Sequence, residues 1–71
     1  MLVVDITDAN EDVKDKLRGA IRFFNGDKNN INICIKMGED IKSCGQIYLT
    51  EDILKVFEKI VGKEKIELKR D

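Results

Sequence analysis

The segment that most constrains the fold is residues 45–68, which read in order as a strand, a capped helix, a helix stop and a second strand. The hydroxyl of Thr50 can cap the first turn of a helix, and the acidic residues after it suit the positive end of the helix dipole. Gly62 can take the left-handed conformation that ends a helix. Ile66 and Leu68 then alternate with polar residues, as in a half-buried strand. Residues 45–68 therefore predict one β-α-β half of a small domain.

Residues 2–36 repeat this order in a weaker form. Alternation of apolar and polar side chains over residues 2–7 predicts a strand. Asp8 and Glu11 have the spacing of a capping box, so a helix is predicted to start at Asp8, and Gly26 marks its end. The residues that this helix is predicted to bury are Val13, Leu17, Ala20, Ile21 and Phe24.

A hairpin is predicted between the two halves. Residues 31–37 show the cleanest alternation in the chain, and residues 38–40 (Gly-Glu-Asp) resemble a three-residue hairpin loop that leads into a strand over residues 41–49. The predicted cross-strand pairs are Ile31 with Ile47, Ile33 with Gly45, Ile35 with Ser43, and Met37 with Ile41.

The resulting order is β-α-β-β-α-β. We expect an α+β, ferredoxin-like split β-α-β sandwich, with two helices on one face of a four-stranded antiparallel sheet. Residues 1–68 are predicted to form this single domain, and residues 69–71 a frayed tail. Gly19 weakens its helix by about 1 kcal/mol relative to alanine, and we expect it to serve close packing of the helix against a strand.

Composition narrows the class of function. The net charge of -1 gives no general attraction for nucleic acid, whose phosphates are bound through basic residues. No apolar run approaches the roughly 20 residues that span a bilayer, and two cysteines do not form a disulfide scaffold, so a cytoplasmic, reduced protein is expected. The chain has no histidine, which removes the commonest general base and metal ligand. No catalytic residue, cofactor or metal site is predicted.

Two groups of reactive side chains are assigned to the scaffold. Cys34 and Cys44 are predicted to face each other across neighbouring strands on the outer sheet face, as reduced thiols that could be oxidised to a disulfide if the geometry allows. A metal would require further ligands. Carboxylates also gather near the start of the first helix, where acids are favourable. They are Asp8, Glu11, Asp12 and Asp15.

Two aromatic side chains fit the predicted core poorly. Phe23 lies about 100° from the centre of the apolar stripe of its helix, and Tyr48 is the only aromatic residue on the predicted outer sheet face. RNA-binding sheets of this kind stack bases on two or three aromatic residues, so a single tyrosine argues against that function. Exposed aromatic side chains commonly anchor protein interfaces. Phe23 and Tyr48 are therefore the candidate partner-binding residues.

Four parts of the chain together resemble a known family. They are residues 25–27 (Asn-Gly-Asp) after the first helix, the alternating strand 31–37, residues 45–54 (Gly-Gln-Ile-Tyr-Leu-Thr-Glu-Asp-Ile-Leu), and the pattern Phe-x-x-Ile-Val-Gly-x-x-x-Ile-x-Leu over residues 57–68. In this order they are similar to the extreme C-terminal region of the bacterial DNA polymerase III alpha subunit. The resemblance covers nearly the whole chain, and its residues are mostly structural.

This resemblance implies a C-terminal fragment of a much longer polymerase, with Met1 not necessarily its native start. The nucleotidyltransferase chemistry of DNA replication would then lie upstream. The region itself is non-catalytic in that family and is associated with binding the tau subunit of the clamp loader. The expected partners are therefore this tau subunit and the rest of the polymerase holoenzyme. No binding residue is carried over, because no recognition motif of the region is visible. The alternatives are a stand-alone ferredoxin-like regulatory or ligand-binding domain, which would dimerise through its sheet, and a nucleic-acid-binding module.

Overall fold

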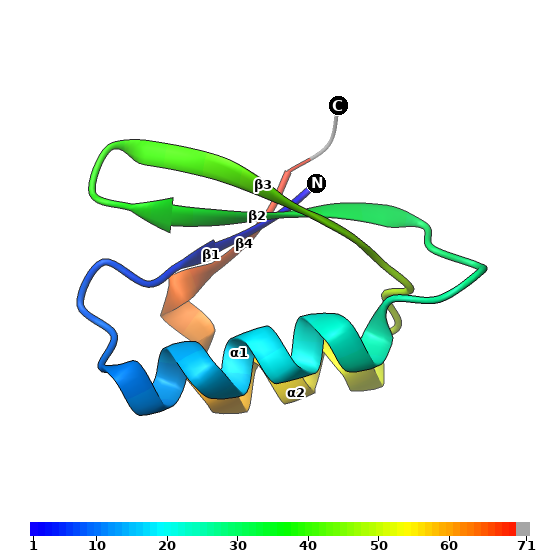
Figure 1. Cartoon of the computed structure of the whole chain (residues 1–71), viewed down its shortest axis with the longest axis horizontal. Coiled ribbons are helices and arrows are strands. Elements are labelled where there is room, and N and C mark those ends of the chain that lie inside the picture. Colours follow the sequence, from blue (N-terminus) through cyan, green and yellow to red (C-terminus); the bar gives the residue numbers. More distant parts are fainter. Residues whose placement is uncertain (70–71) are drawn as a thin grey trace.

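The computed structural model describes residues 1–69 and contains one sheet with two helices packed on one of its faces (Figure 1). Neither helix has the length and hydropathy needed to cross a lipid bilayer in this described part of the chain. The elements are β1 (Leu2–Asp5), α1 (Glu11–Phe24), β2 (Ile31–Met37), β3 (Asp40–Ile47), α2 (Glu51–Val61), the 3-10 turn η1 (Lys63–Lys65) and β4 (Ile66–Leu68).

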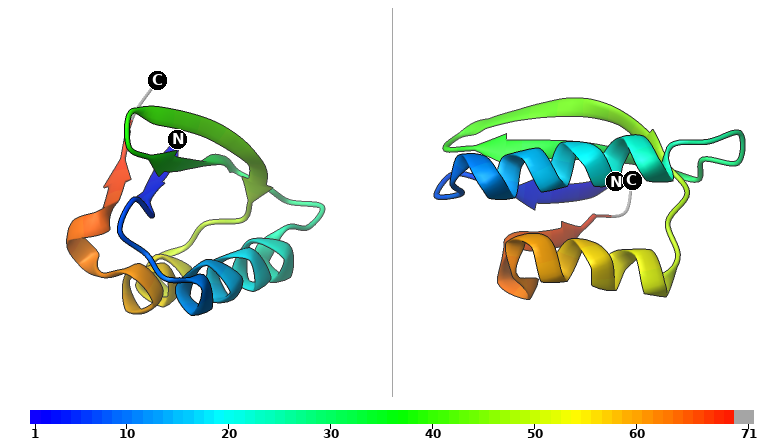
Figure 2. Two further views of the ribbon diagram at one scale, coloured as in Figure 1. Left: turned by 60° about the vertical axis from the view of Figure 1, so that its left-hand side comes forward. Right: turned by 60° about the horizontal axis from the view of Figure 1, so that its bottom comes forward.

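The strand order is β3-β2-β1-β4. The predicted β-α-β-β-α-β order and the two helices on one face of a four-stranded, ferredoxin-like sheet are confirmed. The sheet is mixed, however, and the prediction of a fully antiparallel sheet is wrong. β1 and β2 are parallel neighbours, whereas β3 and β4 run antiparallel to their partners. The crossover through α1 returns the chain directly beside β1, and no strand lies between the two parallel strands (Figure 2). The predicted splitting of this β-α-β unit is therefore also wrong.

Pairing of β2 with β3 contains an irregularity that the alternation of side chains did not predict. Cys44 and Gly45 together oppose the single residue Ile33, which makes a β-bulge. Gly45 has a φ of +112°, a conformation that favours glycine. The observed pairs are Ile31–Ile47, Asn32–Gln46, Cys34–Ser43, Ile35–Lys42, Lys36–Ile41 and Met37–Asp40.

The bulge reverses the faces of β3 between Cys44 and the hairpin turn. The predicted pair Ile31–Ile47 is confirmed, and Ile33 is opposed by Gly45 together with Cys44 rather than by Gly45 alone. The two predicted pairs nearer the turn, Ile35–Ser43 and Met37–Ile41, are wrong. Lys42 pairs with Ile35 and lies on the helix-facing side, whereas Ile41 lies on the outer side and is 47% exposed. The turn itself has two residues rather than three, with Gly38 at a φ of +63°.

Helix boundaries follow their capping side chains. Thr50 caps α2 through a hydrogen bond from the backbone N–H of Ile53, as predicted, and Gly62 follows the helix with a φ of +99°. The predicted cap of α1 at Asp8 is wrong. A capping box formed by Asp8 and Glu11 would start the helix two residues earlier than the observed cap, which is Asn10. The side chain of Asn10 accepts the N–H of Val13 at 2.9 Å.

The core lies between the sheet and the two helices. Phe57 of α2, Leu17 of α1 and the inward residues of the strands are buried there. Gly19 does not pack against a strand, contrary to the prediction, because nothing lies within 4 Å of a Cβ placed on it. The predicted frayed tail is ordered at its first residue, since Lys69 and Met1 exchange two backbone hydrogen bonds. Residues 70–71 lie outside the described residues.

Candidate binding surfaces

The two predicted partner-binding residues come from the same end of the molecule. Phe23 is 81% exposed at the end of α1, and Tyr48 is 46% exposed directly after β3. The backbone N–H of Tyr48 donates to the carbonyl oxygen of Phe24 at 3.1 Å, so the two segments are tied together. We call the exposed pair Phe23 and Tyr48 the aromatic end.

The aromatic end rests on the core. The ring of Phe23 meets the ring of Phe24 edge to face, with centroids 5.1 Å apart. Phe24 in turn lies 6.0 Å from the ring of Phe57, which is fully buried. The contact with Phe24 restrains one side of the Phe23 ring, and any such preorganisation favours binding. That Phe23 and Tyr48 contact a partner stays a prediction.

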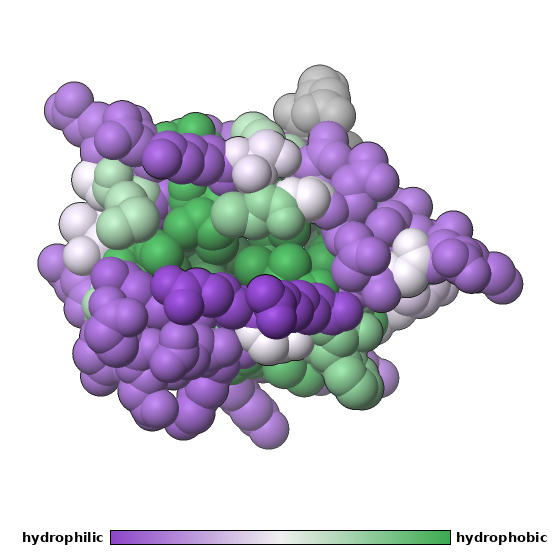
Figure 3. Space-filling view, viewed as in Figure 1, coloured by the Kyte–Doolittle hydropathy of each residue, from purple (hydrophilic) through white to green (hydrophobic). Residues whose placement is uncertain are grey.

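A second surface was not predicted from the sequence. A groove of about 620 Å³ lies between α1 and the β2–β3 hairpin. Its apolar floor contains Ile6, Leu17, Ile21 and Ile35, with Met37 at the hairpin end. Figure 3 shows this hydrophobic band open to solvent, between the hairpin above and a hydrophilic strip along α1 below. We call it the hairpin groove.

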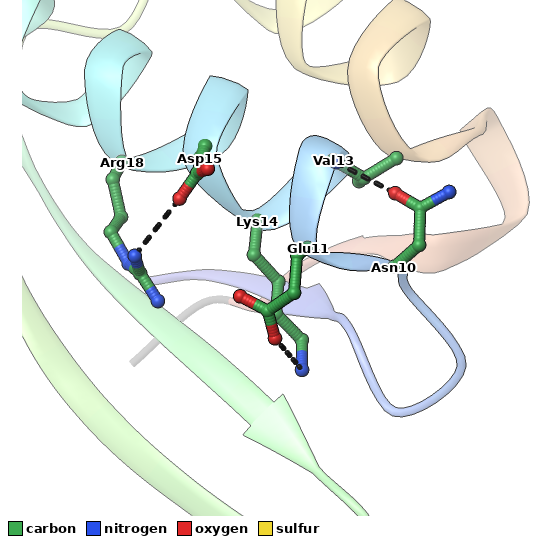
Figure 4. Close-up of polar contacts among 6 residues, drawn as sticks. All are labelled: Asn10, Glu11, Val13, Lys14, Asp15 and Arg18. Atoms are coloured by element: carbon green, nitrogen blue, oxygen red, sulfur yellow. Dashed lines mark hydrogen bonds and ion pairs between the residues drawn. The ribbon is translucent and has the colours of Figure 1, made fainter.

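Basic side chains line one rim of the hairpin groove. Lys14, Arg18 and Arg22 recur every fourth residue of α1 and therefore lie along one side of the helix. Lys14 pairs with Glu11 at 3.7 Å and Arg18 with Asp15 at 3.1 Å (Figure 4). Both pairs lie within the helix. Each has a solvent-exposed carboxylate, 80% for Glu11 and 68% for Asp15, so both pairs are weak and are screened by salt.

The opposite rim comes from β3, where Asp40, Lys42 and Cys44 line the hairpin groove. Lys42 and Cys44 are there because of the bulge. With the regular register predicted above, Lys42 and Cys44 would have faced outward. Gly45 is the sequence signal that could have revealed this, because an isolated glycine inside an alternating strand suggests a bulge.

The two cysteines lie on opposite faces of the sheet, so the prediction that they face each other is wrong. Cys34 pairs with Ser43 on the outer face, where its thiol lies 3.3 Å from the sulfur of Met1 and is almost fully buried. Cys44 lines the hairpin groove on the other face. Partial burial of the Cys44 thiol raises its pKa above the ordinary value, and repulsion from Cys34 adds to this. Both cysteines are free.

The four carboxylates near the start of α1 do not share a pocket in the described residues, and only Asp8 lines one, of about 210 Å³. Each is exposed and has a basic neighbour instead, as expected for solvated side chains at a helix N-terminus. The pairs are Glu11–Lys14, Asp12–Lys16, Asp15–Arg18 and Asp8–Lys65. Over residues 1–69, no group of three or more metal-ligating side chains is found.

Asp5 has a different setting at the end of β1. The hydroxyl and the backbone N–H of Thr7 both donate to its carboxylate, at 2.6 and 2.9 Å, and these hydrogen bonds lower the pKa of Asp5. The Thr7 hydroxyl oxygen also accepts the backbone N–H of Gly38 at 2.8 Å. This chain of contacts joins β1 to the hairpin turn and is structural.

Comparison of the chain with protein-family models, with curated protein sequences and with solved structures found no match.

Proposed function

We propose that this chain is a non-catalytic protein-interaction domain, namely the C-terminal domain of a bacterial DNA polymerase III alpha subunit, and that it contributes to contact with the tau subunit of the clamp loader. The proposal rests on the family resemblance, and the residues that carry it have structural roles in the fold. Thr50 caps α2, Gly62 follows that helix, and Ile66 and Leu68 belong to β4. DNA synthesis would be the task of the parent chain, in the cytoplasm.

The aromatic end is the observation on which the interaction role rests. A phenylalanine that is 81% exposed leaves apolar area in contact with water, and each buried Å² of such area is worth about 25 cal/mol. Tyrosine and other aromatic side chains carry much of the binding energy in protein interfaces. Phe23 and Tyr48 project from segments joined by a backbone hydrogen bond, so a single partner could engage both.

Calorimetric titration with the clamp-loader tau subunit tests the proposal. Replacing Phe23 and Tyr48 by alanine together should raise the dissociation constant by at least about tenfold, because central aromatic residues of an interface each contribute on the order of 1 kcal/mol or more. Ile41→Ala is the matched control, since Ile41 is similarly exposed (47%) but lies by the hairpin turn. An unchanged dissociation constant for the double variant, or no binding by the wild type, would contradict the proposal.

A second candidate function is a stand-alone regulatory or ligand-binding domain. The hairpin groove favours it, because its volume of about 620 Å³ lies in the range of small-molecule sites, roughly 300–1,000 Å³. Such a domain would dimerise through its sheet. Sedimentation separates the two candidates: a tight dimer supports the regulatory domain, and a monomer supports the polymerase domain.

A further inference from the structure

The hairpin groove combines an apolar floor with an excess of positive charge. Four basic residues line it, on both rims, against the single carboxylate of Asp40. The whole chain has a net charge of -1, so this positive surface is local and not a consequence of composition. Arg22 and Lys42 have no ion-pair partner among residues 1–69. Their charges are available to a ligand.

We propose that the hairpin groove binds an acidic, apolar peptide segment of a partner protein. Apolar side chains of the segment would cover the floor around Ile21 and Ile35, and its carboxylates would meet the basic rims. The inference goes beyond the proposed function, because neither Phe23 nor Tyr48 lines this groove. It therefore holds or fails independently of what binds at the aromatic end.

The distribution of charge favours a peptide over a single small acid. Lys14, Arg18 and Arg22 are spaced four residues apart, which at about 1.5 Å per residue sets them along a row of roughly 12 Å. Lys14 and Arg18 already have weak ion pairs with Glu11 and Asp15, and the two unpaired charges, Arg22 and Lys42, lie on opposite rims. The single carboxylate of a fatty acid could therefore meet only part of this positive surface. A peptide segment carries several carboxylates at intervals of a few ångströms, so it can neutralise the row and Lys42 on the other rim.

The floor argues against nucleic acid as the occupant. Proteins that bind single strands combine basic grooves with aromatic side chains on which the bases stack. The residues that line the hairpin groove include isoleucine, leucine and methionine but no aromatic residue. Aliphatic floors suit the aliphatic side chains of a peptide, whose burial is driven by the hydrophobic effect.

Two fluorescein-labelled peptides of leucine and glutamate provide the test, measured by fluorescence anisotropy against the whole chain. One alternates the two residues, as an extended segment would, and the other places leucine at helical spacing. We expect at least one of them to bind, with an affinity that falls as salt is added. Versions with lysine in place of glutamate should not bind. If neither glutamate peptide binds at concentrations up to about 1 mM, the proposal is wrong.

Substitutions locate the binding. The double variant Arg22→Gln/Lys42→Gln should raise the dissociation constant about fivefold, as expected for two partly exposed charge pairs. Lys59→Gln is a matched control, because Lys59 lies in the last turn of α2 as Arg22 does in α1. It should leave the affinity unchanged. Equal effects of the double variant and the control on the dissociation constant of the peptide would overturn the proposal. The proposal would also fail if oligothymidylate bound more tightly than the glutamate peptides and lost affinity in the double variant in the same way.

Cys44 provides a second, independent readout of position. Its thiol lines the groove, whereas that of Cys34 is on the other face. A bound glutamate peptide should slow alkylation of Cys44 by iodoacetamide, in proportion to occupancy, and leave alkylation of Cys34 unchanged. If the protein is saturated with the peptide and Cys44 is not protected, the peptide binds elsewhere and the assignment to this groove is refuted.

Discussion

Two glycine-to-alanine substitutions should change stability in opposite directions, because the two glycines differ in backbone conformation and not in packing. Nothing lies within 4 Å of a Cβ added at Gly19 or at Gly45. Gly19 lies inside α1, whereas Gly45 lies in the bulge of β3 with a φ of +112°. Any difference between the two variants therefore reports the backbone alone.

The magnitudes follow from these conformations. Gly19→Ala should stabilise the fold by about 0.5–1 kcal/mol, because alanine has the higher helix propensity and restricts the unfolded chain. Gly45→Ala should destabilise it by about 1–2 kcal/mol, because a side chain is strained in this region of backbone space. A chain of 71 residues is expected to have a free energy of unfolding of about 4–10 kcal/mol, so both changes are measurable.

Urea denaturation followed by circular dichroism is the assay. With a slope of about 1 kcal/mol per molar urea, the two midpoints should lie about 1.5–3 M apart, with Gly19→Ala the higher. Nuclear Overhauser contacts across β2 and β3 should show whether Gly45→Ala keeps the Ile35–Lys42 pairing. If Gly45→Ala is as stable as the wild type and keeps this pairing, the reasoning about the bulge is refuted.

Three further predictions concern the interior, the end of β1 and the thiols. Phe57→Ala should lose about 3–5 kcal/mol of stability, as for other buried aromatic residues, and a loss under 1 kcal/mol in urea denaturation would contradict the core described above. Thr7→Val should raise the pKa of Asp5 toward 3.8, because it removes the hydroxyl that donates to the carboxylate. Since the folded-state pKa is depressed, the loss of stability should be largest above pH 3.8 and shrink as pH falls below it; a carboxylate titration by carbon NMR with no change in Asp5 would exclude this contact. Iodoacetamide should modify Cys44 well before Cys34, which is only 6% exposed, and mild oxidation should yield no intramolecular disulfide; rapid disulfide formation would place the thiols on the same face.

Local signals in the sequence are sufficient for the order of the elements and for part of the core. Of the five residues that α1 is predicted to bury, only Leu17 is fully buried, and Ile41 of β3 is exposed. The strong alternation over β2 and the apolar stripe of α2 follow from burial of one face, and Thr50 and Gly62 mark the ends of α2 by their own chemistry. These features depend on neighbours in the chain. They could therefore be predicted without knowing how the elements are arranged.

The order and register of the strands depend on contacts between distant residues, and here the sequence was insufficient. A regular alternation was extended through Gly45, although one extra residue in a strand moves all side chains beyond it to the other face. Regular alternation therefore puts Lys42 and Cys44 on the outer face, and it does not predict the hairpin groove. The cap at Asn10 is not predicted, because the Asp8–Glu11 spacing favours an earlier start of the helix.

The central proposal is that this domain binds the clamp-loader tau subunit through its aromatic end, and it is tested most directly by titrating the isotopically labelled chain with that subunit. Backbone amide resonances of residues around Phe23 and Tyr48 should shift as the tau subunit is added, and the shifts should reach a plateau. The segments of these two residues are joined by the Tyr48–Phe24 hydrogen bond. Residues at the hairpin turn should be unaffected. An absence of shifts at high tau concentration, or shifts confined to residues distant from Phe23 and Tyr48, would contradict the account.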